Sequence, residues 1–433
     1  MDFLPNILFA LALILGIGYF VKNIKKLTRN IKLGKELKIA DNKSQRWRNM
    51  IKIALGQGKM VRRPVAGILH VIVYLGFIVI NIEVLEIILD GIFGTHRLFS
   101  FMGSFYGFLI STFEILAVLV FVSVIVFWIR RNVIRLKRFW NKEMTQWPRH
   151  DANNILYFEM VLMTLFLVMN AADVHFQDMN SGNLISQYLT PWFNGFSEEA
   201  LHIIERSAWW LHILGILVFL NYLYFSKHLH ILLAFPNTYY AKLTPKGQFN
   251  NLESVTKEVR MMMDPNIDSF ATPPENAEVP EKFGASDVTD LSWVSLMNAY
   301  TCTECGRCTS ECPANQTGKK LSPRKIMMDT RDRLEQVGKN IDANKGKFKE
   351  DGKQLLDDYI SREEIWACTS CNACVEACPV SIDPLSIIFE MRRYLVMEQS
   401  AAPSQLNVMM TNIENNGAPW PYNQMDRLNW KNE

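Results

Sequence analysis

The eight cysteines of this chain fall into two runs with the same spacing. Each run reads Cys-x2-Cys-x2-Cys-x3-Cys-Pro, and the runs begin at Cys302 and Cys368. Thiolates at this spacing bind [4Fe–4S] clusters, and the fourth thiolate of each run binds the cluster of the other run. This crossed rule assigns one predicted cluster to Cys302, Cys305, Cys308 and Cys378. It assigns the other to Cys312, Cys368, Cys371 and Cys374.

Other uses of closely spaced cysteines fit this pattern less well. Disulfide bonds need an oxidising compartment and rarely join cysteines that are so close in sequence. Structural zinc sites use two separated Cys-x2-Cys pairs, and a redox-active Cys-x-x-Cys pair stands alone near a βαβ unit. The sequence therefore predicts two cubane clusters, which move single electrons.

Histidines in the apolar stretches are the second set of candidates. His70 lies six residues after Pro64, at the start of the second apolar stretch, and His230 lies near the end of the last one. If these stretches cross a membrane as helices, we expect both histidines at a similar depth in it, near the same face. Two imidazoles at one depth on two helices are what bis-histidine ligation of haem b requires. A satisfied polar residue in a helix bundle is the alternative, but an ionisable residue inside a membrane is a functional hypothesis by default. His228, two positions before His230, should point to another side of a helix.

His212 is a candidate ligand for a second haem. It precedes His230 by eighteen residues, which is about 27 Å along a continuous helix. The haem would need another histidine about ten residues after His70, and Ile80 occupies that place. Histidine partners for His212 could come from the preceding loop, at His175 and His202. Otherwise His212 contacts a quinone or forms a hydrogen bond within the bundle.

Four glutamates also lie in apolar stretches, at Glu83, Glu86, Glu114 and Glu159. Carboxyl groups are costly in hydrocarbon and are retained there for a reason. Proton handling for a quinone is one interpretation, and hydrogen bonding between helices is the other.

The elements that must position these residues are five apolar stretches and a polar C-terminal part. The chain has 433 residues, of which 49% are hydrophobic. Each apolar stretch approaches the ~20 residues that cross a bilayer as a helix. The predicted spans are 4–21, 64–89, 105–128, 153–172 and 207–232.

Charge is distributed unevenly over the connecting segments. Segments 22–63 and 129–151 are rich in Lys and Arg, whereas 90–104 and 173–206 hold one arginine each. The positive-inside rule then places the N-terminus outside and the cysteine-bearing part inside. We expect a multi-pass protein of the cytoplasmic (inner) membrane of a prokaryote, with its cluster domain in the cytoplasm.

The predicted fold class is an all-α bundle of five transmembrane helices, followed by a mainly α-helical domain for two [4Fe–4S] clusters. In this domain Pro323 is expected in the first turn of a helix. The tail is expected to be an irregular arm whose tryptophans, Trp420 and Trp430, dock on this domain or on a partner. The predicted divisions are the membrane domain 1–235, a linker 236–290, the cluster domain 291–398 and the arm 399–433.

Two parts of the chain resemble known families. The last apolar stretch, from His212-Ile-Leu-Gly to Ser226-Lys-His-Leu-His230, resembles the ligand helix of the nitrate reductase gamma subunit and of the cytochrome b subunit of heterodisulfide reductase. The resemblance implies haem-ligand roles for His212 and His230, and for His70 as the partner of His230 at a haem near the cytoplasmic face. A second haem, near the outer face, would need a histidine where this chain has Ile80, so the sequence departs from the family pattern there. Segment 298–392, with Leu321-Ser-Pro-Arg324, resembles the dicluster ferredoxin part of heterodisulfide reductase subunits.

The whole chain resembles fused membrane Fe–S oxidoreductases that are similar to electron-transfer-flavoprotein:quinone oxidoreductases. Those proteins carry a further domain with Cys-Cys-Gly motifs, which this sequence does not contain. The resemblance implies a membrane subunit that passes electrons between a cytoplasmic donor and a membrane quinone through the two clusters and haem b. The donor would be a flavoprotein or a separate Cys-Cys-Gly-type Fe–S subunit, and no nucleic-acid partner is expected.

Two other functions remain open on the sequence. The chain could be a membrane-anchored ferredoxin without haem, or a reductase that uses quinol to reduce a disulfide-type acceptor. An Fe–S assembly or sensing protein is a third class, and its clusters would be labile. The sequence contains no flavin or nucleotide motif. Two Gly-x-Gly pairs, Gly16/Gly18 and Gly56/Gly58, lack the strand–turn–helix context that a dinucleotide site needs.

Overall fold

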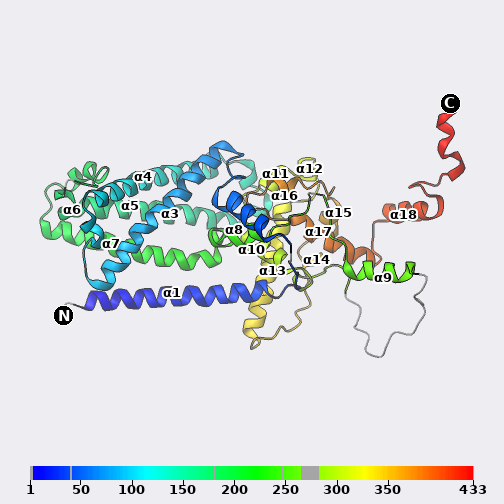
Figure 1. Ribbon diagram of the computed structural model, residues 1–433, viewed down its shortest axis with the longest axis horizontal. Helices are drawn as coiled ribbons and strands as arrows, with labels where there is room; N and C mark the ends of the chain where they lie inside the picture. The colour runs from blue at the N-terminus through cyan, green and yellow to red at the C-terminus, as the bar shows by residue number, and fades with distance from the viewer. Residues whose placement is uncertain (1–2, 40, 180, 246, 265–281, 433) are drawn as a thin grey trace.

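The computed structural model describes residues 3–39, 41–179, 181–245, 247–264 and 282–432. These residues form helices, with isolated β-bridges but no strand among them. A bundle of long helices lies at one end of the molecule, and a group of shorter helices lies at the other end (Figure 1). This agrees with the predicted fold class.

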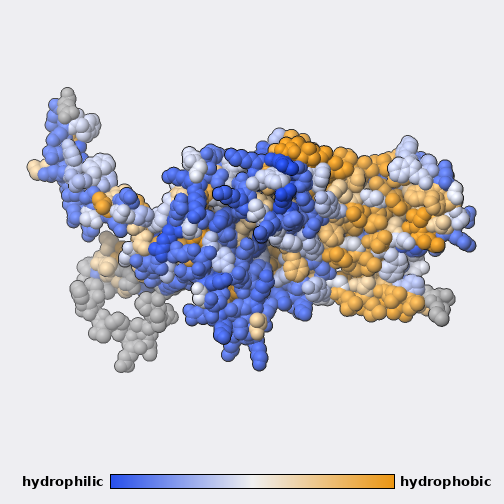
Figure 2. Space-filling view, turned by 180° about the vertical axis from the view of Figure 1, so that it is seen from behind, coloured by the Kyte–Doolittle hydropathy of each residue, from blue (hydrophilic) through white to orange (hydrophobic). Residues whose placement is uncertain are grey.

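Within the described residues, five helices are long and apolar enough to cross a membrane. Three of them, α1, α3 and α5, have proline in the first turn, where its missing N–H costs no hydrogen bond. Figure 2 shows hydrophobic residues covering this bundle and hydrophilic residues covering the other end. The five helices are α1 (Leu4–Ile31), α3 (Pro64–Phe93), α4 (Ser104–Asn132), α5 (Trp147–Ala172) and α7 (Glu198–Tyr222).

The bundle packs around a buried apolar core that includes Phe113, Phe166 and Ile213. Gly91 of α3 faces the ring of Phe9 of α1, and a Cβ built on it would lie 2.5 Å from that ring. A larger residue at position 91 would therefore push α1 away from α3.

The first span is longer than predicted, because its basic end stays helical and reaches the cluster domain. Arg29 pairs with Asp342, and Nδ2 of Asn30 donates to the hydroxyl of Tyr300 at 3.0 Å. The end of α1, which we expected to belong to a basic loop between spans, thus packs against α10 (Trp293–Thr301) and α13 (Pro323–Ala343).

The prediction of one continuous span over 207–232 is wrong. Helix α7 ends at Tyr222, short 3-10 turns follow, and Ser226 has extended backbone angles of φ −112° and ψ 150°. A separate helix, α8 (His230–Tyr239), begins at His230. The 27 Å separation expected between His212 and His230 on a straight helix therefore does not apply.

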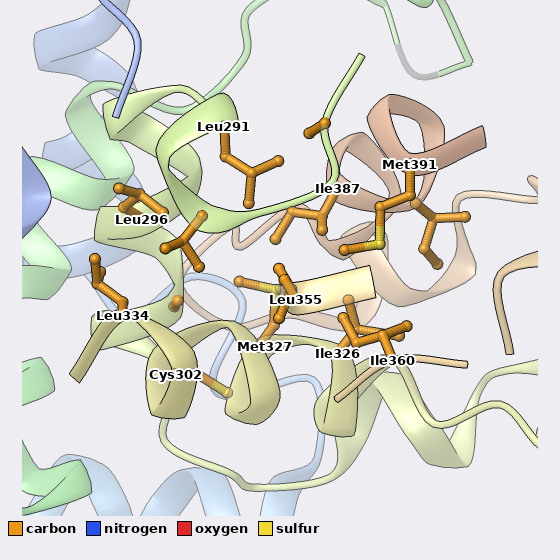
Figure 3. Close-up of a cluster of buried hydrophobic side chains, with 14 of the residues drawn as sticks. Leu291, Leu296, Cys302, Ile326, Met327, Leu334, Leu355, Ile360, Ile387 and Met391 are labelled. Atoms are coloured by element: carbon orange, nitrogen blue, oxygen red, sulfur yellow. The ribbon is translucent and has the colours of Figure 1, made fainter. Parts of the chain in front are cut away.

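The cluster domain has its own buried core, drawn in Figure 3. Leu296, Met327 and Met391 bring together α10, α13 and α17 (Pro384–Arg393). Helix α13 starts as predicted, with Pro323 in its first turn, and the side chain of Ser322 accepts from the Lys325 backbone as N-cap.

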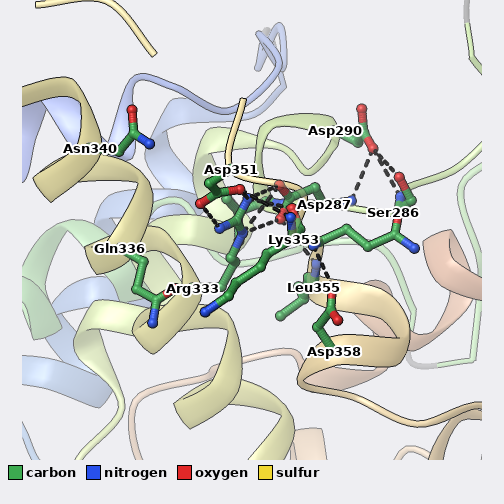
Figure 4. Close-up of polar contacts among 12 residues, drawn as sticks. Ser286, Asp287, Asp290, Arg333, Gln336, Asn340, Asp351, Lys353, Leu355 and Asp358 are labelled. Atoms are coloured by element: carbon green, nitrogen blue, oxygen red, sulfur yellow. Dashed lines mark hydrogen bonds and ion pairs between the residues drawn. The ribbon is translucent and has the colours of Figure 1, made fainter. Parts of the chain in front are cut away.

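A fully buried arginine joins the loops of this domain (Figure 4). Arg333 is 0% exposed and pairs with Asp287 at 2.8 Å and with Asp351 at 2.6 Å. It also donates to the carbonyl oxygen of Lys353 at 2.6 Å. The guanidinium is thus satisfied on several sides, which is what an arginine in a protein interior requires.

The expected linker and arm are partly helical. Helix α9 (Glu253–Met263) lies inside the expected linker, 236–290, of which residues 246 and 265–281 lie outside the described residues. The tail contains α18 (Ser404–Asn416), so it is not irregular throughout. Trp420 and Trp430 are 60% and 71% exposed, so neither is docked on this chain.

Candidate metal centres

The two cysteine runs meet in space, through the short helices α11 (Arg307–Ser310) and α16 (Ala373–Ala377). Cysteines of both runs line one cavity: Cys302, Cys305, Cys308, Cys374 and Cys378. Four of these five are the thiols that the crossed rule assigned to one cluster. The fourth cysteine of the second run has therefore joined three thiols of the first run.

The remaining thiols gather in the same crossed way. Cys312, from the first run, lies close enough to Cys368 and Cys374 to act on them electrostatically. Cys371 is exposed, whereas Cys312 and Cys374 are buried. This second group reaches the surface, and the first group lies deeper.

The two loops repeat the same backbone conformation. Glu304 and Gly306 have φ of +53° and +71°, and the equivalent residues of the second run, Ser370 and Asn372, have +58° and +60°. Glycine fits best at such a position, and a Cβ at Gly306 would also meet Arg324 at 2.5 Å. These turns direct backbone N–H groups toward sulfur, and Ser370 N donates to Sγ of Cys368 at 3.4 Å.

The thiols fit a metal cluster better than they fit isolated cysteines. Burial raises the pKa of Cys302 to about 12 and that of Cys378 to about 11. Such thiols keep their protons at neutral pH, and they deprotonate when the positive charge of a metal is bound. No cysteine forms a disulfide in the described structure.

Two arginines connect the membrane domain to the deeper thiol group, which consists of Cys302, Cys305, Cys308 and Cys378. The guanidinium of Arg307 donates to the carbonyl oxygens of Lys59 and Met60, each at 3.2 Å, just before α3 begins. Arg324, which lines the same cavity and is 1% exposed, pairs with Glu143 at 2.7 Å in the loop between α4 and α5. The deeper thiols therefore lie at the junction with the bundle.

His70 and His230 come together, as the sequence predicted. Their ring centres are 6.3 Å apart. A first-row metal ion bound about 2 Å from one nitrogen of each ring would hold the two centres roughly 6 Å apart. Nδ1 of His230 donates to the carbonyl oxygen of Lys227 at 3.1 Å, and such a bond orients metal-binding histidines through their second nitrogen. Nδ1 of His70 is buried, and no described residue bonds to it. These two imidazoles could therefore hold a metal ion between them.

The expectation that His228 points away from His230 is wrong, because the chain bends there. The two rings lie 5.3 Å apart in an edge-on arrangement. His228 also faces Glu159 of α5, with Nε2 3.8 Å from the carboxylate. Three histidines therefore share one region between α3, α5 and α8.

Lys227 connects this histidine region to the deeper thiols. It is 8% exposed, and its Nζ pairs with the carboxylate of Glu304, which lies between Cys302 and Cys305. Arg331 of α13 pairs with Glu304 at 2.9 Å. Burial alone would raise the pKa of Glu304, but the charges of Lys227 and Arg331 hold it below its usual range. Glu304 is therefore a buried anion held by two cations.

His212 has a different environment. It is 2% exposed, its Nδ1 bonds to the carbonyl oxygen of Leu162 at 3.0 Å, and its ring packs against Phe166 at 6.2 Å. His175, one of its expected partners, instead lies 6.4 Å from His96. The structure gives His212 the hydrogen bond of a packed helix residue.

The roles of the junction residues do not follow from the sequence. No pattern singles out Lys227, Arg307 or Arg331. The Glu304 position within the cysteine run was a visible signal, because a carboxylate beside a metal loop needs a cationic partner. The identity of that partner depends on the bend after α7.

Comparison with known proteins agrees with the cysteine pattern. Residues 301–382 match the 4Fe-4S dicluster domain family. No solved structure shows significant similarity to the chain.

Several curated proteins are similar over longer stretches. A probable iron-sulfur-binding oxidoreductase, FadF, from Bacillus subtilis is 27% identical over 99% of this chain and 61% of its own length. An EtfAB:quinone oxidoreductase from Syntrophomonas wolfei is 26% identical over 91% of this chain and 55% of its own length. A probable membrane-anchored ferredoxin from Chromohalobacter salexigens is 30% identical over 36% of this chain and 25% of its own length.

The chain thus spans between about half and two thirds of the length of the first two relatives. Subunits of heterodisulfide reductases from two Methanosarcina species match shorter stretches, of 153 and 108 residues. The chain is a homologue of iron–sulfur oxidoreductases, with a 4Fe-4S dicluster domain attached to five membrane-type helices.

Proposed function

We propose that the chain is the membrane subunit of a quinone oxidoreductase complex. It would pass electrons between a cytoplasmic donor and a membrane quinone through two [4Fe–4S] clusters and one haem b. A relative named an EtfAB:quinone oxidoreductase supports the quinone and points to a flavoprotein donor. A separate Cys-Cys-Gly-type Fe–S subunit is the other donor we propose.

The geometry supports a specific set of residues as the ligands of these groups. One cluster would bind Cys302, Cys305, Cys308 and Cys378, and the other would bind Cys312, Cys368, Cys371 and Cys374. His70 and His230 would bind the haem iron. When bound, these groups supply one-electron chemistry, and the protein positions them and tunes their potentials.

The observation that carries the proposal is the junction of the two domains. Arg307 lines the deeper thiol cavity and bonds to the segment that leads into α3, the helix of His70. Lys227 bonds through its Nζ to Glu304 of the cysteine loop and through its carbonyl oxygen to His230. Lys227 therefore contacts both the loop of the deeper thiols and the histidine pair. The exposed Cys371 marks the other group as the side that meets a donor.

The orientation in the membrane is proposed from the positive-inside rule. The cluster domain would lie in the cytoplasm of a prokaryote, and the arm 399–433 would extend from it. The domain division 1–235, 236–290, 291–398 and 399–433 is retained as part of this proposal.

A reconstitution experiment tests the proposed function. The detergent-purified protein is mixed anaerobically with a reduced quinone analogue, or with dithionite followed by the oxidised analogue. Electron paramagnetic resonance follows the clusters, and visible difference spectra follow haem. Electron exchange of clusters and haem with the quinone is expected. Stable clusters without haem or quinone exchange would instead support the membrane-anchored ferredoxin, and labile clusters would support an assembly role.

A further inference from the structure

A line of carboxyl groups on α3 leads into the bundle from the end remote from the cluster domain. Glu83, Glu86 and Asp90 follow one face of the helix at intervals of three and four residues, and they are 3%, 4% and 8% exposed. Helix α3 begins beside the cluster domain and ends at Phe93 near the opposite end of the bundle (Figure 1). Asp90 is therefore the outermost of the three, and Glu83 is the innermost.

The outer two carboxyl groups have structural partners. Asp90 accepts from the backbone N–H groups of Arg97 and Leu98 at 2.8 and 3.0 Å. Glu86 accepts from the backbone of Phe99 at 2.8 Å and from the hydroxyl of Tyr106 at 3.1 Å. Both groups fix the connection between α3 and α4.

Glu83 differs from both. Its Oε2 is buried, and no residue in the described parts of the chain donates to it. Glu83 precedes the end of α3 by ten residues, which is about 15 Å. An ionised carboxylate at this depth without a donor would be costly, whereas the protonated group is not.

Polar contacts join this line to the surface. The hydroxyl of Tyr106, which bonds to Glu86, lies 3.3 Å from Nη1 of Arg97. Nε of Arg97 donates to Asp173 at 2.8 Å, and Asp173 lies 3.2 Å from Nε2 of His96, which is 42% exposed. Arg97 keeps its own proton: burial alone would lower its pKa, but Tyr106 and Asp173 raise it. Arg97 therefore anchors this polar network, which connects Tyr106 to Asp173 and His96.

We propose that Glu83 is a proton-exchanging carboxyl that serves the membrane quinone from the bundle end remote from the cluster domain. This inference rests on the proposed function. A quinone that accepts two electrons also accepts two protons and becomes quinol; the electrons would arrive one at a time from the cluster side, and protons would pass through Glu83. Quinol oxidation releases the two protons by the same carboxyl. Electrons and protons would then enter from opposite ends of the bundle.

Redox-induced difference infrared spectroscopy tests this role on the purified, cofactor-loaded protein. Wild type, Glu83→Gln, Glu83→Asp and Glu114→Gln are compared. Glu114 is the matched control: it is 0% exposed, and its two oxygens already accept from Asn170, Ile185 and Ser186. We expect a C=O band of a protonated carboxyl that changes on reduction in wild type, shifts in Glu83→Asp, disappears in Glu83→Gln and persists in Glu114→Gln.

Turnover with a quinol analogue is measured on the same samples. Glu83→Gln is expected to be slower by roughly 100-fold, with unchanged cluster and haem spectra, and Glu83→Asp to recover part of the rate. A band that survives in Glu83→Gln, or turnover equal to wild type, would overturn the role of Glu83. If wild type exchanges no electrons with the quinone analogue, the proposed function fails, whereas the infrared band still reports whether Glu83 changes protonation.

Discussion

Lys227 links the loop of the deeper cysteines to the histidine pair. Its Nζ pairs with Glu304, between Cys302 and Cys305, and its carbonyl oxygen accepts from Nδ1 of His230 at 3.1 Å. Both partners and Lys227 itself lie within the junction of bundle and cluster domain. A substitution of Lys227 should therefore change the environment of both the cysteine loop and the histidine pair.

Replacing Lys227 with Met tests that link. The variant leaves Glu304 buried with Arg331 as its remaining cation, and breaking a buried ion pair costs about 3 kcal/mol. Thermal unfolding in detergent should shift to lower temperature, and the potential of one cluster should fall because a positive charge is lost nearby. Lys320→Met is the control, because the Lys320–Glu363 pair is exposed, at 61% and 69%, and such pairs contribute little. Equal effects of the two substitutions would contradict the link.

Single cysteine variants test the crossed ligand sets. Cys378→Ser should destroy the cluster that involves the first run, although Cys378 belongs to the second run. Cys312→Ser should destroy the other cluster. Iron content and the electron paramagnetic resonance spectra of the reduced proteins distinguish the two losses. If Cys378→Ser and Cys371→Ser remove the same cluster, each run holds its own cluster and the crossed assignment is wrong.

The contact between Arg324 and Glu143 predicts a pH dependence. Burial alone would raise the pKa of Glu143, but the hydrogen bond and charge of Arg324 lower it below its usual range. A lowered pKa in the folded state stabilises the protein above the unfolded-state pKa of about 4.3, and this stabilisation is lost as the pH falls below that value. At pH 7, Glu143→Gln should be less stable than wild type by about 2 kcal/mol.

Unfolding midpoints of wild type and Glu143→Gln, measured from pH 7 to about pH 3, provide the check. The difference between the two proteins should shrink as the pH falls through the folded-state pKa of Glu143. A difference that does not depend on pH would show that the Arg324–Glu143 ion pair is not its source.

His212 should not be needed for haem. Its Nδ1 bonds to Leu162, its ring packs against Phe166, and Ile80 stands where a second ligand was expected. His212→Ala should therefore retain the full haem content and lose about 2 kcal/mol or more of stability from the cavity. Loss of half of the haem in this variant would mean that a second haem binds near His212.

Much of the architecture could be predicted because its signals are local. Cysteine spacing predicts the dicluster domain that the family match confirms, and apolar length predicts the five membrane-type helices. The crossed ligand sets stay a prediction. The expected pairing of His70 with His230 agrees with the structure, although the reason given for His230, a position near the end of a continuous helix, was wrong. The bend at Ser226 brings His228 within 5.3 Å of His230.

The junction could not be predicted from the sequence. Lys26 and Arg29 form part of a basic segment that the positive-inside rule explains, and the structure shows them paired with Asp342 more than 300 residues away. Arg63 likewise reaches Glu311 at 2.7 Å. Such pairs depend on how two domains dock, and periodicity or spacing within one segment contains no information about docking.

The central claim is that His70 and His230 bind one haem b beside the deeper cluster. The direct test is the ratio of haem to iron in the purified protein, with reduced-minus-oxidised spectra of wild type, His70→Ala, His230→Ala and His212→Ala. We expect one haem for two [4Fe–4S] clusters in wild type and in His212→Ala, and no haem in His70→Ala or His230→Ala, with the cluster iron retained. A wild-type protein without haem, or a haem that survives both substitutions, would contradict the claim.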